Sequence, residues 1–126
     1  MRKSAVLVSV LVVGTLAAAP VAAQAAPAGV TQPYGHLVSG TTWSTGGTYV
    51  AKGGKIELTL KTLPKATDVL VEECEGGGDL GDVQTFTKNA SRHVLATGVA
   101  KGTCFFVLLQ PHAGAGDYRV GGTLKY

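Results

Sequence analysis

The segment Lys55-Ile56-Glu57-Leu58-Thr59-Leu60-Lys61-Thr62 decides the fold class of this chain. Apolar side chains occupy every second position, and charged or hydroxylated side chains occupy the positions between them. Because successive side chains of a β-strand point to opposite faces, this period of two predicts a strand with one face in a core and the other in water. The segment therefore predicts a sheet that is covered on one side only.

Similar short segments lie on both sides of this strand. Residues 47–51 precede it and are followed by Lys52-Gly53-Gly54, a turn signal that predicts either a hairpin or a crossover. The remaining predicted strands are 68–74, 83–87, 92–96, 104–109, 117–120 and 122–126. About seven to eight short strands at intervals of roughly 8 to 12 residues are typical of an all-β sandwich or barrel. We predict a single antiparallel β-sandwich, jelly-roll-like, over residues 34–126.

Two predicted strands, 68–74 and 104–109, are the most continuously apolar, which is typical of central strands buried on both faces. Cys74 ends the first of them and Cys104 begins the second. Two cysteines in an exported protein predict one disulfide, and a bridge requires Cα atoms within about 7 Å. A reactive or metal-binding thiol pair is the alternative, which no CxxC spacing supports. The disulfide would make these strands neighbours, or place them face to face across the sandwich.

The first 25 residues have the features of a secretory signal peptide. Met1-Arg2-Lys3 supplies positive charge, residues 5–19 form a largely apolar run without a charged residue, and Ala23-Gln24-Ala25 offers small residues for cleavage. An apolar run of about 15 residues is shorter than the roughly 20 of a membrane-spanning helix. We predict cleavage after Ala25, an unpatterned leader arm at residues 26–33, and secretion to the extracellular space. The short, alanine-rich signal favours a bacterial source.

The charge balance argues against nucleic acid and anionic membranes as partners. The formal charge is +3, but Arg2 and Lys3 belong to the predicted signal peptide, and the remaining 9 basic and 8 acidic residues nearly balance. No stripe of lysine and arginine is visible, and basic residues do not alternate with aromatic ones. The composition favours a neutral partner or none.

The order of the predicted elements is similar to that of a known family. The matching segments are residues 38–41, 49–50, 53–60, 67–71, 102–107 and 114–120. Together they resemble the bacterial pre-peptidase C-terminal domain, a secreted jelly-roll-like β-sandwich, over nearly the whole chain after residue 25. That domain is usually an appendage of secreted hydrolases, so the resemblance implies a role in secretion, maturation or substrate attachment rather than catalysis. The two cysteines and residues 75–82 depart from the usual pattern of the family.

One acidic segment is a candidate metal site. Five carboxylates lie close together along a glycine-rich stretch, namely Glu72, Glu73, Glu75, Asp79 and Asp82. Ca²⁺ requires hard oxygen ligands on a flexible loop, so Asp79 and Asp82 are the first ligands that we would assign. The spacing matches no EF-hand, and an ordinary solvated loop is the alternative. No other cofactor is predicted.

Aromatic residues are the second kind of candidate site. Trp43 lies between Thr41-Thr42 and Ser44-Thr45, a polar setting for a large ring, and Tyr49 follows in the next strand. Both offer an apolar body with a polar tip, which suits stacking on a sugar ring. The alternative is packing at the edge of the core.

The sequence predicts no catalytic site. His36, His93 and His112 show no HxxxH or HExxH spacing, and no serine lies in a GxSxG elbow. Ser91 and His93 could form a triad with Asp82 in space, but common residue types allow such sets by chance.

The predicted function is therefore not enzymatic. We expect a secreted binding or accessory domain that acts through a surface on an extracellular protein or a polysaccharide. The alternative is a secreted inhibitor of a protease or glycosidase, with a disulfide-braced loop at residues 75–82 or 110–116 inserted into the cleft of the enzyme.

Overall fold

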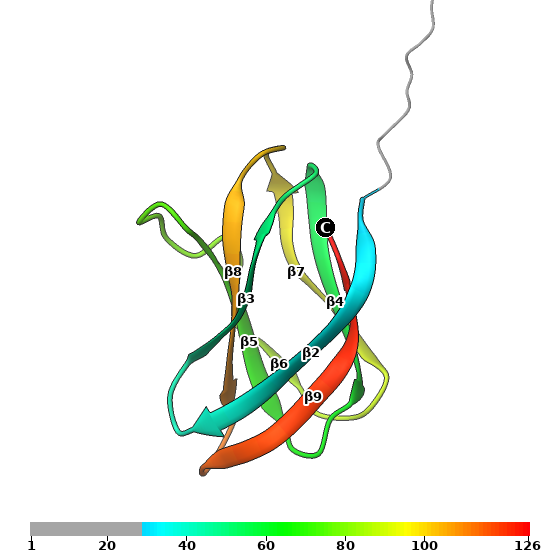
Figure 1. Ribbon diagram of the computed structural model, residues 1–126, viewed down its shortest axis with the longest axis vertical. Helices are drawn as coiled ribbons and strands as arrows, with labels where there is room; N and C mark the ends of the chain where they lie inside the picture. Colours follow the sequence, from blue (N-terminus) through cyan, green and yellow to red (C-terminus); the bar gives the residue numbers. More distant parts are fainter. Residues whose placement is uncertain (1–28) are drawn as a thin grey trace, which may run out of the picture.

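A computed structural model describes residues 29–126 as a fold made of strands and turns (Figure 1). The strands are β2 (Thr31–Gly40), β3 (Ser44–Val50), β4 (Gly54–Thr62), β5 (Thr67–Glu73), β6 (Gln84–Phe86), β7 (Ser91–Val99), β8 (Cys104–Pro111) and β9 (Gly116–Lys125). The described residues include no helix, and hence none with the length and apolar character needed to cross a membrane. The all-β prediction is confirmed.

The strands form two four-stranded antiparallel sheets. The first sheet has the order β2-β9-β4-β7, and the second has the order β3-β8-β5-β6. Counted along the chain from β2, these are strands 1-8-3-6 and 2-7-4-5, which is the order of a jelly roll built from two Greek keys. The connection from β3 to β4 therefore crosses from one sheet to the other, and the hairpin alternative at Lys52-Gly53-Gly54 is wrong.

The core lies between the two sheets. The alternation in β4 is as predicted, with Ile56, Leu58 and Leu60 buried and the residues between them turned outward. The largest fully buried side chains come from both sheets and include Phe86, Phe105, Leu95, Leu109, Leu124 and Val38. Burial of these side chains is the main force that holds the sheets together.

The two most apolar strands differ in burial. Residues 67–71 of β5 are all buried, as expected of a central strand buried on both faces. In β8, buried residues alternate with half-buried ones, so Phe105, Val107 and Leu109 face the core while Phe106 and Leu108 face outward. The prediction that both faces of β8 are buried is therefore wrong. No second layer of the described residues is stacked on the outer side of this sheet.

The predicted strands 117–120 and 122–126 are one continuous strand, β9. The pair Gly121-Gly122 does not form a turn, because Tyr34 pairs with Gly122 on one side and Leu60 pairs with it on the other. A Cβ atom at Gly122 would collide with the carbonyl oxygen of Thr59. Glycine is thus required here for the close approach of β9 to β4.

The fold begins earlier than predicted. Strand β2 starts at Thr31, whereas the leader arm was expected to extend to residue 33. The amide of Val30 donates to the carbonyl of Tyr126 (2.6 Å), and the amide of Tyr126 donates to the carbonyl of Val30 (2.9 Å). This pairing with the last residue extends the strand. The predicted signal peptide and residues 26–28 of the predicted arm lie outside the described residues.

The predicted disulfide is present. Cys74 and Cys104 are bonded, with Cα atoms 5.3 Å apart. They lie next to each other at the ends of β5 and β8, where the amide of Cys74 also donates to the carbonyl of Cys104 (2.9 Å). The bridge therefore ties two neighbouring strands of the second sheet together.

A histidine lies at each of the two sides of the sandwich where an edge strand of one sheet meets an edge strand of the other. Between β2 and β3, His36 Nε2 lies 2.9 Å from Ser44 Oγ, and this hydroxyl donates to the carbonyl of Leu109. Between β6 and β7, His93 Nδ1 lies 3.2 Å from Gln84 Oε1, and the imidazole packs on the ring of Phe86. Both imidazoles thus satisfy polar groups where the two sheets meet.

We predict that stability falls as the pH drops below 6.5, because of His36. Burial lowers the pKa of His36 below its ordinary value of 6.5, and the positive charge of Arg119 lowers it further. The unfolded chain therefore binds a proton at a higher pH than the folded chain does, so stability is lost as the pH falls from 6.5 through the folded pKa. The urea midpoint should decline over this range in the wild type and much less in His36→Gln. Equal declines in both proteins would contradict this assignment.

The buried hydroxyl group of Tyr34 should lower the free energy of unfolding of the domain. The Tyr34 side chain is buried beside Gly46, and its hydroxyl has no hydrogen-bond partner within residues 29–126. An unsatisfied buried hydroxyl costs about 1 to 3 kcal/mol, so Tyr34→Phe should raise the free energy of unfolding by about 1 kcal/mol. Tyr118→Phe is the matched control, because the Tyr118 hydroxyl bonds Thr67 Oγ1 at 2.6 Å and its loss should destabilise. Urea unfolding should give opposite signs, and a loss of stability in both variants would refute the prediction.

Candidate functional site

The outward side of the second sheet is the candidate site, and we call it the outer face. Phe106 and Leu108 of β8 point outward at its centre and are half-buried. Leu70 of β5 pairs with Leu108 and is 6% exposed, yet it is not part of the core cluster between the sheets. Leu70 is therefore covered by its neighbours on the outer face. The outward side thus has an apolar centre of its own.

The strand register shows how this centre continues across the sheet. Thr45 of β3 pairs with Leu108, and Thr48 pairs with Phe106. Val50, which is 51% exposed, pairs with Cys104 at the disulfide end. On the other side, Val83 directly precedes β6 and is 47% exposed. Apolar and threonine side chains therefore extend from β3 across the sheet toward β6.

The charge on this sheet has one sign. Strands β3, β5, β6 and β8 contain no lysine, arginine or histidine, and β5 carries Asp68, Glu72 and Glu73. The connection from β5 to β6 adds Glu75, Asp79 and Asp82. Asp68 and Glu72 lie on the outward side with Leu70, whereas Glu73 pairs with Phe105 and lies on the core-facing side. The outer face is consequently an apolar surface with an acidic border.

The acidic loop at residues 75–82 projects from the body of the sandwich beside β5 (Figure 1). The amide of Glu73 donates to the carbonyl of Gly78 (3.1 Å), and the amide of Leu80 donates to the carbonyl of Val71 (2.8 Å). Asp79 forms an isolated β-bridge with Glu72. Partial desolvation, and then a hydrogen bond and repulsion from Asp79, raise the pKa of Glu72 above its ordinary value. The loop is therefore folded back on the end of β5.

The calcium prediction gains no support from this loop. Asp79 lies against Glu72, and within residues 29–126 no three side chains of histidine, cysteine, aspartate or glutamate are placed to hold a metal ion. Asp82 is exposed at the far end of the loop. The predicted ligands Asp79 and Asp82 are consistent with the alternative of a solvated acidic loop.

A polar cluster lies at the opposite end of the outer face. The Asp68 carboxylate accepts hydrogen bonds from Thr85 Oγ1 (2.7 Å), His112 Nδ1 (2.8 Å) and Gln110 Nε2 (3.3 Å). Burial raises the pKa of Asp68, but the bonds from Thr85, His112 and Gln110 outweigh it and the pKa lies below its ordinary value. Sequence reasoning missed this cluster because its members are up to 44 residues apart. Its one visible signal is a carboxylate inside an apolar run.

The hydrogen bonds of this cluster connect β5 with β6 and with the end of β8. A carboxylate that orients a histidine is part of many catalytic sites, but a nucleophile must then lie beside the free imidazole nitrogen. Within the described residues, the imidazole of His112 has a hydrogen bond only to Asp68. The triad of Ser91, His93 and Asp82, which the sequence allowed only by chance, is not assembled, since His93 bonds Gln84 and Ser91 Oγ donates to the carbonyl of Lys88.

The two predicted aromatic contacts lie in different settings. Tyr49 faces inward from β3, with its ring centroid 5.6 Å from that of Phe105 and 5.3 Å from that of Tyr126. This agrees with the packing alternative for Tyr49. Trp43 is half-buried and directly precedes β3. Continued by one residue, the register of β3 and β8 would place Trp43 opposite Gln110, at the border of the outer face.

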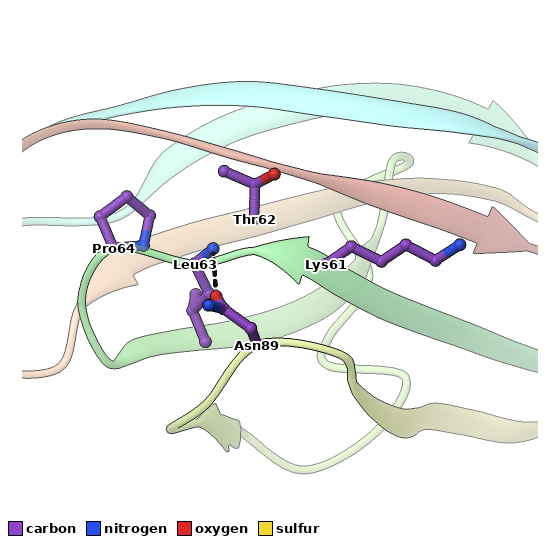
Figure 2. Close-up of a pocket in the computed structure, with 5 residues that line it drawn as sticks. All are labelled: Lys61, Thr62, Leu63, Pro64 and Asn89. Carbon is purple, nitrogen blue, oxygen red and sulfur yellow. Dashed lines mark hydrogen bonds between the residues drawn. The ribbon is translucent and has the colours of Figure 1, made fainter.

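A shallow pocket lies away from the outer face (Figure 2). Lys61, Thr62, Leu63, Pro64 and Asn89 line it, with a volume of about 260 Å³. Ligand pockets are usually about 300 to 1,000 Å³. Asn89 Oδ1 already accepts the amide of Leu63 (2.8 Å), and Lys61 extends away from Asn89 (Figure 2). The asparagine therefore ties two connections together, and the outer face remains the stronger candidate.

Comparisons with known proteins give no further guide. No family model, no curated protein and no solved structure matches the chain. The resemblance to the pre-peptidase C-terminal domain stays a prediction.

Proposed function

We propose that this protein is a secreted, non-enzymatic binding domain that acts through the outer face on an extracellular protein. The observation that carries this proposal is the pair of half-buried side chains Phe106 and Leu108 at the centre of that face. Large apolar side chains exposed as a contiguous patch mark interaction surfaces on small proteins. A disulfide in a small β domain also agrees with an extracellular location.

The face suits a protein better than a polysaccharide. Sugar rings stack on exposed aromatic rings, and Tyr49, the second predicted ring, packs against Phe105 and Tyr126. An apolar centre with a charged border is instead the arrangement found in protein interfaces. Attachment to a hydrolase, as the resemblance to the pre-peptidase C-terminal domain implies, is one form of this function.

The test is capture of partners from the secretome and the cell-wall fractions of the producing organism, under oxidising conditions. The variant Phe106→Thr/Leu108→Thr should abolish capture of the specific partner, because it removes the apolar centre but keeps β-forming residues. Val94→Thr is the matched control, since Val94 is 39% exposed on the first sheet. Capture that is equal in wild type and in the outer-face variant would overturn the proposal.

A second candidate function is inhibition of a secreted hydrolase by the acidic loop. The projection of residues 75–82 beside the disulfide favours it (Figure 1). The purified protein should then inhibit one enzyme in a panel of secreted proteases and glycosidases. Replacement of Gly76-Gly77-Gly78 by Ala-Ala-Ala should remove that inhibition, because Gly76 has a φ of 71° that alanine tolerates poorly. Absence of inhibition across the panel would count against this candidate.

A further inference from the structure

We propose that the partner of the outer face is a second copy of this chain, which docks with the outward side of its first sheet. This inference rests on the proposed function of the outer face as a binding surface. It adds the identity of the partner. The contact is head-to-tail, because the outer face of one copy meets the outward side of the first sheet of the next copy.

The first argument is charge complementarity. The strands of the first sheet carry five basic residues and two acidic ones, and all seven point outward: Lys55, Lys61, Arg92, Arg119, Lys125, Glu57 and Asp117. The strands of the second sheet carry no basic residue, and two acidic residues, Asp68 and Glu72, lie on its outward side. A chain that is nearly neutral after residue 25 thus presents two faces of opposite sign. Faces with opposite potentials attract and orient one another.

The cations of the first sheet are largely unpaired by other side chains. Within residues 29–126, the one ion pair that involves them joins Lys55 Nζ to Glu57 Oε2 at 3.1 Å. Lys61, Arg92, Arg119 and Lys125 are exposed and form no ion pair among the described residues. Their charges are therefore available to an acidic partner surface.

The second argument is the placement of exposed apolar side chains. The described residues have four large exposed hydrophobic side chains, and they divide evenly between the two sides. Val50 and Val83 border the outer face, while Leu37 and Val94 lie on the outward side of the first sheet. Leu37 pairs with Arg119, and Val94 pairs with Glu57. Each side thus offers apolar contacts between its charges.

The contact predicts a particular form of assembly. Because two different faces meet, each added copy leaves one acidic face and one basic face unoccupied, so association continues as an open chain. Strands lie about 4.8 Å apart and rise about 3.4 Å per residue, so a four-stranded face of such short strands covers roughly 500 Å². This is less than the roughly 800 Å² that each partner buries in a stable complex. We therefore expect weak association, detectable at high protein concentration and low salt.

The experiment is sedimentation velocity of the purified protein over a range of concentrations at 20 mM and 500 mM NaCl. The weight-average mass should exceed that of a dimer at low salt, and association should weaken at least tenfold at high salt, where charges are screened. Protein that stays monomeric to millimolar concentration at low salt would overturn the proposal. So would association that is indifferent to salt.

Two charge-reversed variants distinguish a lost contact from a misfolded protein, because a misfolded variant would not associate in a mixture either. Glu72→Lys/Glu75→Lys/Asp79→Lys/Asp82→Lys reverses the acidic border of the outer face and makes both faces positive, and Arg92→Glu/Lys125→Glu makes both faces negative. Each variant alone should be monomeric at low salt, whereas their equimolar mixture should associate, because each then meets a face of opposite sign. A mixture that stays monomeric while the wild type associates would refute the face-to-face contact. Lys88→Glu, in the connection between β6 and β7, is the control for net charge.

The Val94 variant separates this proposal from the proposed function. Val94→Thr should weaken self-association, because Val94 lies on the docking side of the second copy, but it should leave capture of a foreign protein unchanged. If self-association fails while Phe106→Thr/Leu108→Thr still abolishes capture of a foreign protein, the proposed function stands and the second copy is the wrong occupant. If the outer-face variant changes neither, both proposals fail.

Discussion

Replacing Cys74 and Cys104 together by serine should lower the free energy of unfolding by about 3 to 4 kcal/mol. The bridge closes a loop with a sequence separation of 30 between its ends. Without it, the unfolded chain gains the conformations that this loop closure removes. The loss is large for a domain of this size, whose total stability is expected to be about 5 to 15 kcal/mol.

Guanidinium unfolding of the wild type and of Cys74→Ser/Cys104→Ser measures this loss. The pairing of β5 with β8 should survive, because seven residue pairs and the buried side chains of Val69 and Val71 hold those strands together without the bridge. Wild type unfolded in the presence of a reductant is the control, and its stability should match that of the variant. A loss below about 1 kcal/mol would show that the unfolded chain stays compact around this loop.

The fold class follows from alternation that the sequence shows directly. Ile56, Leu58 and Leu60 recur at the period of a half-buried strand, and this is how β4 is buried. The pair Cys74 and Cys104 predicted that their two strands either are neighbours in one sheet or face each other across the sandwich. In the structure the two strands are neighbours. Strand ends were less predictable, because the start of β2 depends on hydrogen bonds between Val30 and Tyr126, at opposite ends of the domain.

The candidate site was harder to predict than the fold. The run Cys104-Phe105-Phe106-Val107-Leu108-Leu109 reads the same whether its strand is covered on both faces or leaves one face to a partner. The structure decides between these readings because no described strand or helix is stacked over Phe106 and Leu108. The cluster around Asp68 was invisible for a related reason, since Asp68, Thr85 and the pair Gln110 and His112 come from three separate segments of the chain.

Charge segregation depends entirely on topology. Along the chain, basic and acidic residues nearly balance, and no basic stripe is visible. The jelly roll sorts the strands, so that β4, β7 and β9, with all the basic strand residues, lie in one sheet, and β5, with three acidic residues, lies in the other. The sequence-based expectation of a neutral partner considered only the sum of these charges. The folded chain has two charged faces, and they are what a partner would meet.

The two neighbouring phenylalanines of β8 provide the second large prediction. Phe105 is fully buried and packs against Tyr49 and Tyr126, each at a ring-centroid distance of 5.6 Å. Phe105→Ala leaves a cavity between the sheets and should lower the free energy of unfolding by about 3 to 5 kcal/mol. Phe106→Ala is the same substitution one residue along, on the outer face, and should cost only about 1 kcal/mol because that ring is only partly buried.

Urea unfolding of both variants compares the two faces of one strand. Phe105→Ala should cause the large loss of stability, because Phe105 is part of the core. Phe106→Ala should cause the loss of self-association, because Phe106 lies on the face that contacts the partner. Equal losses of stability would mean that Phe106 is packed as tightly as Phe105, and the outer face would then be no docking surface. Phe106→Ala that folds stably and still self-associates like the wild type would leave the fold as described but remove the apolar centre from the contact. The pair of variants thus separates the residues that hold this sandwich together from those that it presents to a partner.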